Sequence, residues 1–177
     1  MQNTAAYWIK KLDLTPLPEE GGLYKENYRS DMTFKQESLP NTYAGDRTAI
    51  TDIYYLLQGD MFSAFHKLKS DEIWHYHAGS ALRVHCINPS GNYHVETLGT
   101  NLEDDEKLRV TLPRGVWFAA ELQNKAKENY ALVSCVVAPG FEFADFELGN
   151  RATLTELYPD YAEIIHKLTR NQPVFLS

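Results

Sequence analysis

The sequence is poor in cysteine, in basic residues and in long apolar runs. It has two cysteines in 177 residues, too few for the disulfide framework that holds small secreted domains together. Lysine and arginine number 17 against 24 acidic residues, which gives a net charge of −7, and they form no cluster. A protein that binds the phosphate backbone of nucleic acid needs a stripe of basic residues, and a membrane span needs a long apolar run. We therefore expect no nucleic-acid partner and no membrane insertion.

The two cysteines also bear on the compartment. Cys86 and Cys135 both lie in apolar runs, which favours buried, reduced thiols. The N-terminus shows no signal-peptide pattern. We expect a cytoplasmic protein.

The sequence is rich in aromatic and apolar residues. Hydrophobic residues make up 44% and aromatic residues 12%, which is typical of a folded globule. The length predicts a single domain over residues 1–177. Eleven tyrosines and three tryptophans exceed the needs of a minimal core. The surplus indicates a cavity lining or a subunit interface.

The residue pattern predicts short strands between two helical ends. Thr4 caps an N-terminal helix, and Thr153 with Glu156 forms a capping box for a C-terminal one. Alternation and turn signals predict strands at residues 23–29, 48–57, 61–68, 73–77, 81–87, 93–98, 107–112, 116–122 and 130–137. No helix interrupts them, so the fold class is all-β, an antiparallel sandwich or barrel.

The strand at residues 23–29 carries a carboxylate between two tyrosines. Regular alternation places Tyr24, Glu26 and Tyr28 on one face and Arg29 on the other. Glu26 is then either a pocket group or a rim residue, and the sequence leaves both readings open.

The stretch at residues 63–79, SAFHKLKSDEIWHYHAG, organises the rest of the chain. It reads as two strands joined by a turn at residues 69–71. His66 and Glu72 lie on neighbouring strands and are expected to point into one cavity. Ser63 has the opposite strand parity to His66, so it joins that cavity only if the strand is irregular.

This stretch resembles the first motif of the cupin superfamily, G-x5-H-x-H-x3,4-E-x6-G. His66, Leu68, Glu72 and Gly79 stand at its His, His, Glu and Gly positions. The second motif, G-x5-P-x-G-x2-H-x3-N, is echoed at residues 113–115, with Phe118 and Leu122 at its His and Asn positions. The resemblance is stronger to the "cupin five" group, through the stretches PEEGGLYKENYRS, TAITDIYYLL, SAFHKLKSDEIWHYHAG, LPRGVWFAAEL and LVSCVVAPGFEFADFEL.

The resemblance implies a double-stranded β-helix (cupin jelly roll), a ligand-sized cavity and a homodimer. Metal-binding cupins use three histidines and a glutamate, whereas Leu68 and Phe118 cannot coordinate an ion. The two ligands that remain, His66 and Glu72, are too few for a stable site. We therefore predict no metal ligand and no cofactor, with weak binding of a divalent metal left open.

His75 and His77 form a second histidine pair, two apart on one strand. In a regular strand they face away from the cavity, whereas a β-bulge after Glu72 would turn them inward as metal ligands. A structural role at a sheet face or dimer interface is the other reading.

Without a metal, His66 and Glu72 form a general acid–base pair. Jelly-roll sugar-nucleotide epimerases work in this way with a tyrosine as the acid, and Tyr76 or Tyr24 is available for that role. We expect a carbohydrate or nucleotide-sugar isomerase or epimerase, a non-catalytic metabolite-binding module, or a metal-dependent cupin enzyme.

The catalytic candidates are His66, Glu72 and Tyr76. The candidates for binding a small polar metabolite are Tyr24, Glu26, Ser63, His66, Glu72, Trp74, His75, Trp117 and Phe118. Phe141 and Phe143 are either core residues or lid residues over the barrel mouth.

Overall fold

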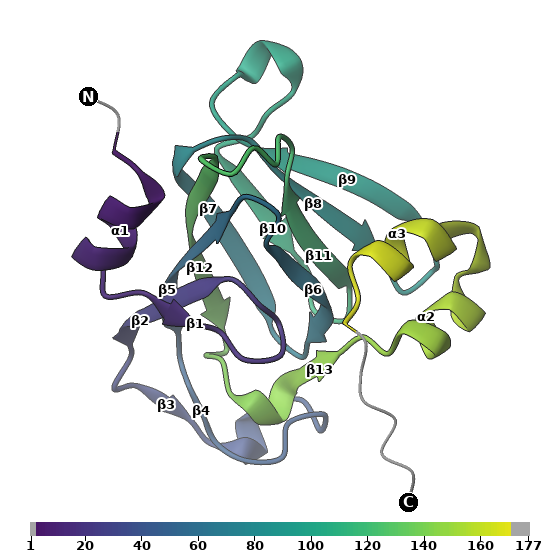
Figure 1. The fold of residues 1–177 in the computed structure, drawn as a ribbon. Helices are drawn as coiled ribbons and strands as arrows, with labels where there is room; N and C mark the ends of the chain where they lie inside the picture. Colours follow the sequence, from purple (N-terminus) through teal and green to yellow (C-terminus); the bar gives the residue numbers. More distant parts are fainter. Residues whose placement is uncertain (1–2, 171–177) are drawn as a thin grey trace, which may run out of the picture.

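The computed structural model describes residues 3–170, which form two antiparallel sheets facing each other (Figure 1). The six-stranded sheet has the order β1 (Thr15–Pro16), β2 (Leu23–Arg29), β5 (Thr51–Gln58), β12 (Tyr130–Ala138), β7 (Asp71–Gly79) and β10 (Arg109–Leu112). The five-stranded sheet has the order β13 (Phe146–Leu148), β6 (Phe62–Leu68), β11 (Trp117–Leu122), β8 (Leu82–Ile87) and β9 (Tyr93–Leu98). The all-β jelly roll expected from the sequence is confirmed.

The remaining elements are short. β3 (Thr33–Phe34) pairs with β4 (Arg47–Thr48) in a small ladder. The helices are α1 (Ala5–Lys11), α2 (Arg151–Leu157) and α3 (Ala162–Lys167), and the single 3₁₀ turns are η1 (Gln36–Ser38), η2 (Leu102–Asp104), η3 (Phe143–Asp145) and η4 (Pro159–Tyr161).

The main core fills the space between the two sheets. Alternate residues of each strand point inward, because side chains on a strand have a period of two. The largest of these buried side chains are Tyr55, Trp74 and Phe118. Cys86 and Cys135 belong to this core and are free thiols, as the sequence predicted.

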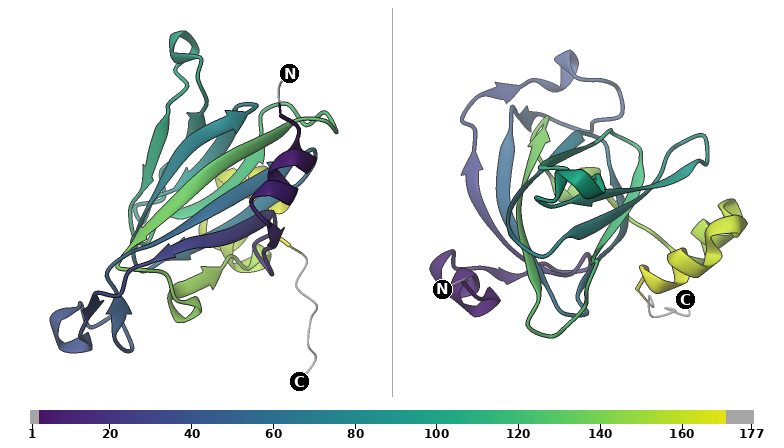
Figure 2. Two further views of the ribbon diagram at one scale, coloured as in Figure 1. Left: turned by 90° about the vertical axis from the view of Figure 1, so that its left-hand side faces the viewer. Right: turned by 90° about the horizontal axis from the view of Figure 1, so that it is seen from above.

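The helices cover the outer faces of the barrel on opposite sides (Figures 1 and 2). Helix α1 packs on the six-stranded sheet, and its N-cap is Thr4, as predicted. Helices α2 and α3 cover the five-stranded sheet. The capping box at Thr153 is wrong, because Asn150 caps α2 and accepts a hydrogen bond from the Thr153 amide.

A bulge in β2 changes which residues face the barrel interior. Glu26 pairs with Ile53, but Tyr28 pairs with the next residue of β5, Asp52, so Asn27 is the extra residue. The parity therefore inverts after Glu26. Tyr28, expected beside Glu26, lies on the outer face and is 53% exposed. Arg29, expected outside, turns inward.

A second bulge, in β6, brings Ser63 onto the face of His66. His66 pairs with Phe118 and Ser63 with Ala120, so three residues of β6 span two of β11. The irregular strand that the sequence analysis left open is present, and Ser63 points inward.

The third bulge lies in β7 at His77, between the partners of Leu132 and Val133. It comes after Tyr76, so regular parity holds from Glu72 to Tyr76. Glu72 and Trp74 point inward and are buried, whereas His75 lies on the outer face. A bulge directly after Glu72, which would have turned His75 inward, does not occur.

Candidate functional site

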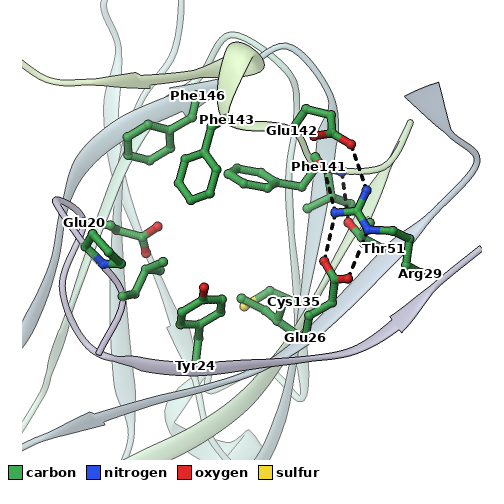
Figure 3. A pocket seen from close by; sticks show the side chains of 14 residues that line it. Glu20, Tyr24, Glu26, Arg29, Thr51, Cys135, Phe141, Glu142, Phe143 and Phe146 are labelled. Carbon is green, nitrogen blue, oxygen red and sulfur yellow. Dashed lines mark hydrogen bonds and ion pairs between the residues drawn. The ribbon is translucent and has the colours of Figure 1, made fainter. Parts of the chain in front are cut away.

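A cavity of about 330 Å³ opens at the end of the barrel where β1, β2 and the segment before β13 meet. Figure 3 shows three phenylalanines along one side, Tyr24 opposite them, Glu20 at one end and Arg29 at the other. The lining residues are Leu17, Pro18, Glu20, Tyr24, Glu26, Arg29, Thr51, Ile53, Cys135, Val137, Phe141, Glu142, Phe143 and Phe146.

Glu20 comes from the loop between β1 and β2 and reaches the cavity end. The hydroxyl of Ser63 donates a 2.8 Å hydrogen bond to its Oε1, and Nε2 of His66 lies 3.8 Å from its Oε2. The loop turns at Gly21 and Gly22, both at positive φ. A Cβ on Gly22 would lie 2.5 Å from the Tyr55 hydroxyl, so only glycine fits there.

The imidazole of His66 is fixed on all sides. Its Nδ1 lies 2.7 Å from the carbonyl oxygen of Ala64, and because a carbonyl can only accept, Nδ1 carries a proton. The ring packs against Phe118 at 4.1 Å and stacks on Phe146 at 5.2 Å between centroids. Its free nitrogen, Nε2, is therefore directed toward Glu20.

Glu72 is the most perturbed carboxyl near the cavity. Its side chain is buried, and the residue is 6% exposed. Burial, and then the charge of Glu20, raise its pKa to about 8. Its Oε2 has no hydrogen-bond partner among the described residues. Burial and the charge of Glu72 also raise the pKa of the Cys135 thiol, which lines the cavity. At neutral pH Glu72 is therefore mainly the uncharged acid.

Arg29 closes the other end of the cavity. Its Nε and Nη2 donate to the two oxygens of Glu26 at 3.0 and 2.9 Å, and its Nη1 donates to Glu142 at 2.8 Å. Nη2 also contacts the carbonyl of Phe141 at 3.3 Å. These hydrogen bonds, led by that to Glu26, raise the pKa of Arg29. We call these three charged residues the clasp, because they tie β2 to the segment that carries Phe141 and Phe143.

The structure brings some of the sequence candidates together at this cavity. Tyr24 and Glu26 line it, while Ser63 and His66 contact Glu20 behind it. The contact of the His66 imidazole is with Glu20, not with Glu72 as expected.

Other candidates lie away from the cavity lining. Trp74 is a core residue, and the Tyr76 hydroxyl donates to the carbonyl of Gly79 at 2.6 Å. Trp117 faces α2 and α3, with Lys67 over its ring at 4.4 Å. Phe118 faces the barrel interior and contacts His66 without lining the cavity. His75, on the outer sheet face, is also outside the lining.

The sequence analysis missed Glu20 and Arg29 as site residues. Glu20 lies in a loop, where no strand alternation assigns it a face. Arg29 was assigned to the wrong face because a bulge leaves no clear mark in the residue pattern. Phe141 and Phe143, left open as core or lid residues, line the cavity mouth, and Phe143 is 61% exposed.

A metal site of the kind that cupins use does not fit these residues. Within residues 3–170, no group of three or more His, Cys, Asp or Glu side chains is placed to hold an ion. The ring of Phe118 packs directly against His66, so hydrocarbon occupies the neighbourhood of the imidazole where a second ligand would be needed.

The family described as Cupin superfamily (DUF985) matches residues 6–149. The chain belongs to the cupin superfamily. The yeast Saccharomyces cerevisiae has a relative, the uncharacterised protein YML079W, that is 33% identical over 133 residues. That match covers 71% of this chain and 66% of the relative, just under two thirds of its length.

Solved cupin-fold structures resemble the whole chain. Protein SO0799 from Shewanella oneidensis is 33% identical, with a TM-score of 0.85 over 97% of this chain and 100% of that one. A hypothetical protein from Leishmania major is 36% identical, with a TM-score of 0.84 over 96% and 100%. Oxalate decarboxylase from Bacillus subtilis, at 15% identity and a TM-score of 0.52 over 97% of this chain and 42% of that one, shares the fold alone. Among the described helices of this cupin, none has the length and apolar character to cross a membrane.

Proposed function

We propose that this cupin binds a small metabolite in the cavity and moves a proton on it without a metal, as an isomerase or epimerase does. One observation carries the proposal. The carboxylate of Glu20 faces a largely apolar cavity and is backed by a buried histidine and a buried carboxyl whose pKa is about 8. A buried carboxyl with a raised pKa close to a cavity-facing carboxylate is typical of acid–base sites.

The chemistry follows from where these groups lie. Glu20 removes a proton from a carbon beside a carbonyl, the C–H electrons form a carbon–carbon double bond, and the carbonyl π electrons move to the oxygen, which becomes an enol when it is protonated. The hydroxyl of Tyr24, across the cavity in Figure 3, supplies the proton for that oxygen. A solvent proton then adds to the opposite face of that carbon, the enol oxygen returns its proton to Tyr24, and Glu20 releases its proton to solvent, which completes the isomerisation. His66 does not line the cavity, and its Nε2 lies 3.8 Å from the Glu20 carboxylate, so it is a positioning residue rather than the base.

The size and the charge of the cavity limit the kinds of ligand that it can bind. A volume of about 330 Å³ is at the lower end for ligand pockets, and suits a single ring or a short chain. Among the described residues that line the cavity, Arg29 is the only cation that could meet a diphosphate, and both neighbouring glutamates already bind it. Of the ligands considered from the sequence, a monosaccharide-sized metabolite fits better than a nucleotide sugar.

Hydrogen exchange with solvent tests the proposal. The protein is incubated in heavy water with a panel of small carbonyl metabolites, and deuterium incorporation at carbon is followed by NMR. We expect incorporation into at least one compound, loss of that exchange in Glu20→Gln, and no change in Glu163→Gln on the exposed face of α3. Exchange that persists in Glu20→Gln would refute Glu20 as the base.

A non-catalytic binding module is the second candidate, and one observation favours it. Of Glu20, His66 and Glu72, only Glu20 lines the cavity. A metabolite that raises the melting temperature of the protein but exchanges no hydrogen would support this candidate, because selective binding to the folded state raises stability by mass action.

A further inference from the structure

The lining of the cavity carries more negative than positive charge. Three carboxylates, those of Glu20, Glu26 and Glu142, face one guanidinium, that of Arg29. The whole chain has a net charge of −7. Apolar walls concentrate the field of such charges inside a cleft. An anion entering this cavity is therefore repelled, and a cation is attracted.

The single cation is not available to an anionic ligand. Arg29 donates to both oxygens of Glu26 and to Glu142. A ligand carboxylate would have to displace one of these glutamates and would then lie beside it. Arg29 therefore balances the glutamates of the mouth, and Glu20 remains as the carboxylate at the other end.

The walls between the two ends are aromatic. Tyr24 lies on one side, and Phe141, Phe143 and Phe146 lie on the other (Figure 3). Phe141 and Phe143 meet edge to face, with centroids 5.1 Å apart. The negative faces of such rings attract cations, an effect that grows when the cation is shielded from water. The exposed ring of Phe143 is free to cover a ligand.

We propose that the ligand of this cavity is a small organic cation, a protonated amine, amidine or guanidine no larger than a single ring or a short chain. Glu20 is its charge partner, and the rings of Tyr24, Phe143 and Phe146 form its walls. This assignment rests on the proposed function, in that it takes the same cavity as the ligand site, and it adds the chemical class of the ligand.

Three probes of nearly equal shape test the charge preference. Benzamidine, benzamide and benzoate are titrated into the full-length protein by calorimetry at low ionic strength. We expect benzamidine to bind at least about tenfold more tightly than benzamide, and benzoate to bind most weakly. Added salt should lower the affinity for benzamidine and leave the affinity for benzamide unchanged, because screening acts on the charged ligand. Equal affinities, or a preference for benzoate, would overturn the assignment.

Two variants tie the preference to named residues. Glu20→Gln should lower the affinity for benzamidine by about tenfold or more and leave benzamide unaffected. Phe143→Leu changes an exposed position, where folding tolerates the change. It should lower the affinity for benzamidine more than the affinity for benzamide. Glu163→Gln is the matched control and should alter neither. Unchanged benzamidine binding in both test variants would contradict the proposal even if Glu20→Gln folds poorly.

The probes also separate this proposal from the function on which it rests. If benzamide binds as well as benzamidine does, the cationic class is wrong while the cavity stands as the ligand site. If none of the three binds, the cationic class fails, whereas the proposed function is decided separately by the deuterium exchange of carbonyl metabolites. A double variant, Glu26→Gln with Glu142→Gln, removes both charges that pair with Arg29. It should reverse the order of affinities, so that benzoate binds more tightly than benzamidine. A double variant that keeps the preference for benzamidine would show that the clasp does not set the charge selectivity.

Discussion

Nε2 of His66 lies 3.8 Å from Oε2 of Glu20, although one residue is on a strand of the five-stranded sheet and the other is in a loop of the opposite sheet's edge. The backbone supports this contact, since the amide of Ala64 donates to the Glu20 carbonyl at 2.9 Å. The site is therefore assembled where the N-terminal loop docks on β6.

Glu72 should make the protein less stable as the pH rises. Its pKa is 4.5 in the unfolded chain and about 8 in the fold, so the folded state holds the extra proton between these values. The stabilisation is complete below pH 4.5 and is lost as the pH rises to about 8, by at most about 1.4 kcal/mol per pH unit. The free energy of unfolding of Glu72→Gln, measured with urea across the same pH range, should lack this pH-dependent loss. Parallel curves for the two proteins would show that the carboxyl titrates normally.

His85 should make the protein less stable as the pH falls below neutrality. Burial lowers its pKa to about 4, and its ring lies between the Tyr93 hydroxyl and the carboxylate of Glu121, under α3. The unfolded chain binds a proton near pH 6.5, so stability is lost as the pH falls from there to about 4, again by at most about 1.4 kcal/mol per pH unit. His85→Gln should reduce this loss, while His94→Gln, on an exposed part of β9, should not. Equal acid sensitivity of all three proteins would contradict the prediction.

Removing the clasp should loosen the cavity mouth without unfolding the protein. Arg29 is partly exposed, so Arg29→Ala should cost about 1 kcal/mol or less in the free energy of unfolding. Amide hydrogen exchange in residues 139–146 should nevertheless accelerate, because Arg29 ties this segment to β2. Lys35→Ala, which removes the exposed pair with Asp46, is the matched control. Exchange that is no faster than in the control would mean that the clasp does not restrain the segment.

We expect a homodimer, and the structure suggests its surface. Beyond the two residues that pair with β1, the outer edge of β2 is unpaired in the described chain. Tyr28, on the outer face of β2, and Met32, three residues after the strand ends, are 53% and 62% exposed. Open edges and exposed apolar side chains favour association. Light scattering at micromolar concentration should give the dimer mass, and Tyr28→Lys with Met32→Lys should lower it to the monomer. Leu102→Lys, at a distant exposed position, should have no effect. A monomeric wild-type protein would end the proposal.

The sequence predicted the fold better than it predicted the site, for a physical reason. Strands β6, β8, β9, β11 and β12 were predicted to within one residue at each end, and β5, β7 and β10 to within three, because half-buried strands alternate and turns are rich in Gly, Pro, Asn and Asp. The ladder of β3 and β4 was missed because two residues are too few to show a period. Glu20 was missed because its position depends on how a loop docks, and Arg29 because a single bulged residue inverts parity without a signal of its own.

Asn27 does not line the cavity, yet the charge at the cavity mouth depends on its standing outside the ladder. If Asn27 paired opposite Asp52, each later residue of β2 would shift by one place, so the phenol of Tyr28 would turn inward and the guanidinium of Arg29 toward solvent. Deletion of Asn27 would instead leave Tyr28 opposite Asp52 and Arg29 opposite Thr51, as they are now. A relative that is one residue shorter in this strand can therefore keep the same groups at the mouth, provided that the alignment places its gap at the bulge.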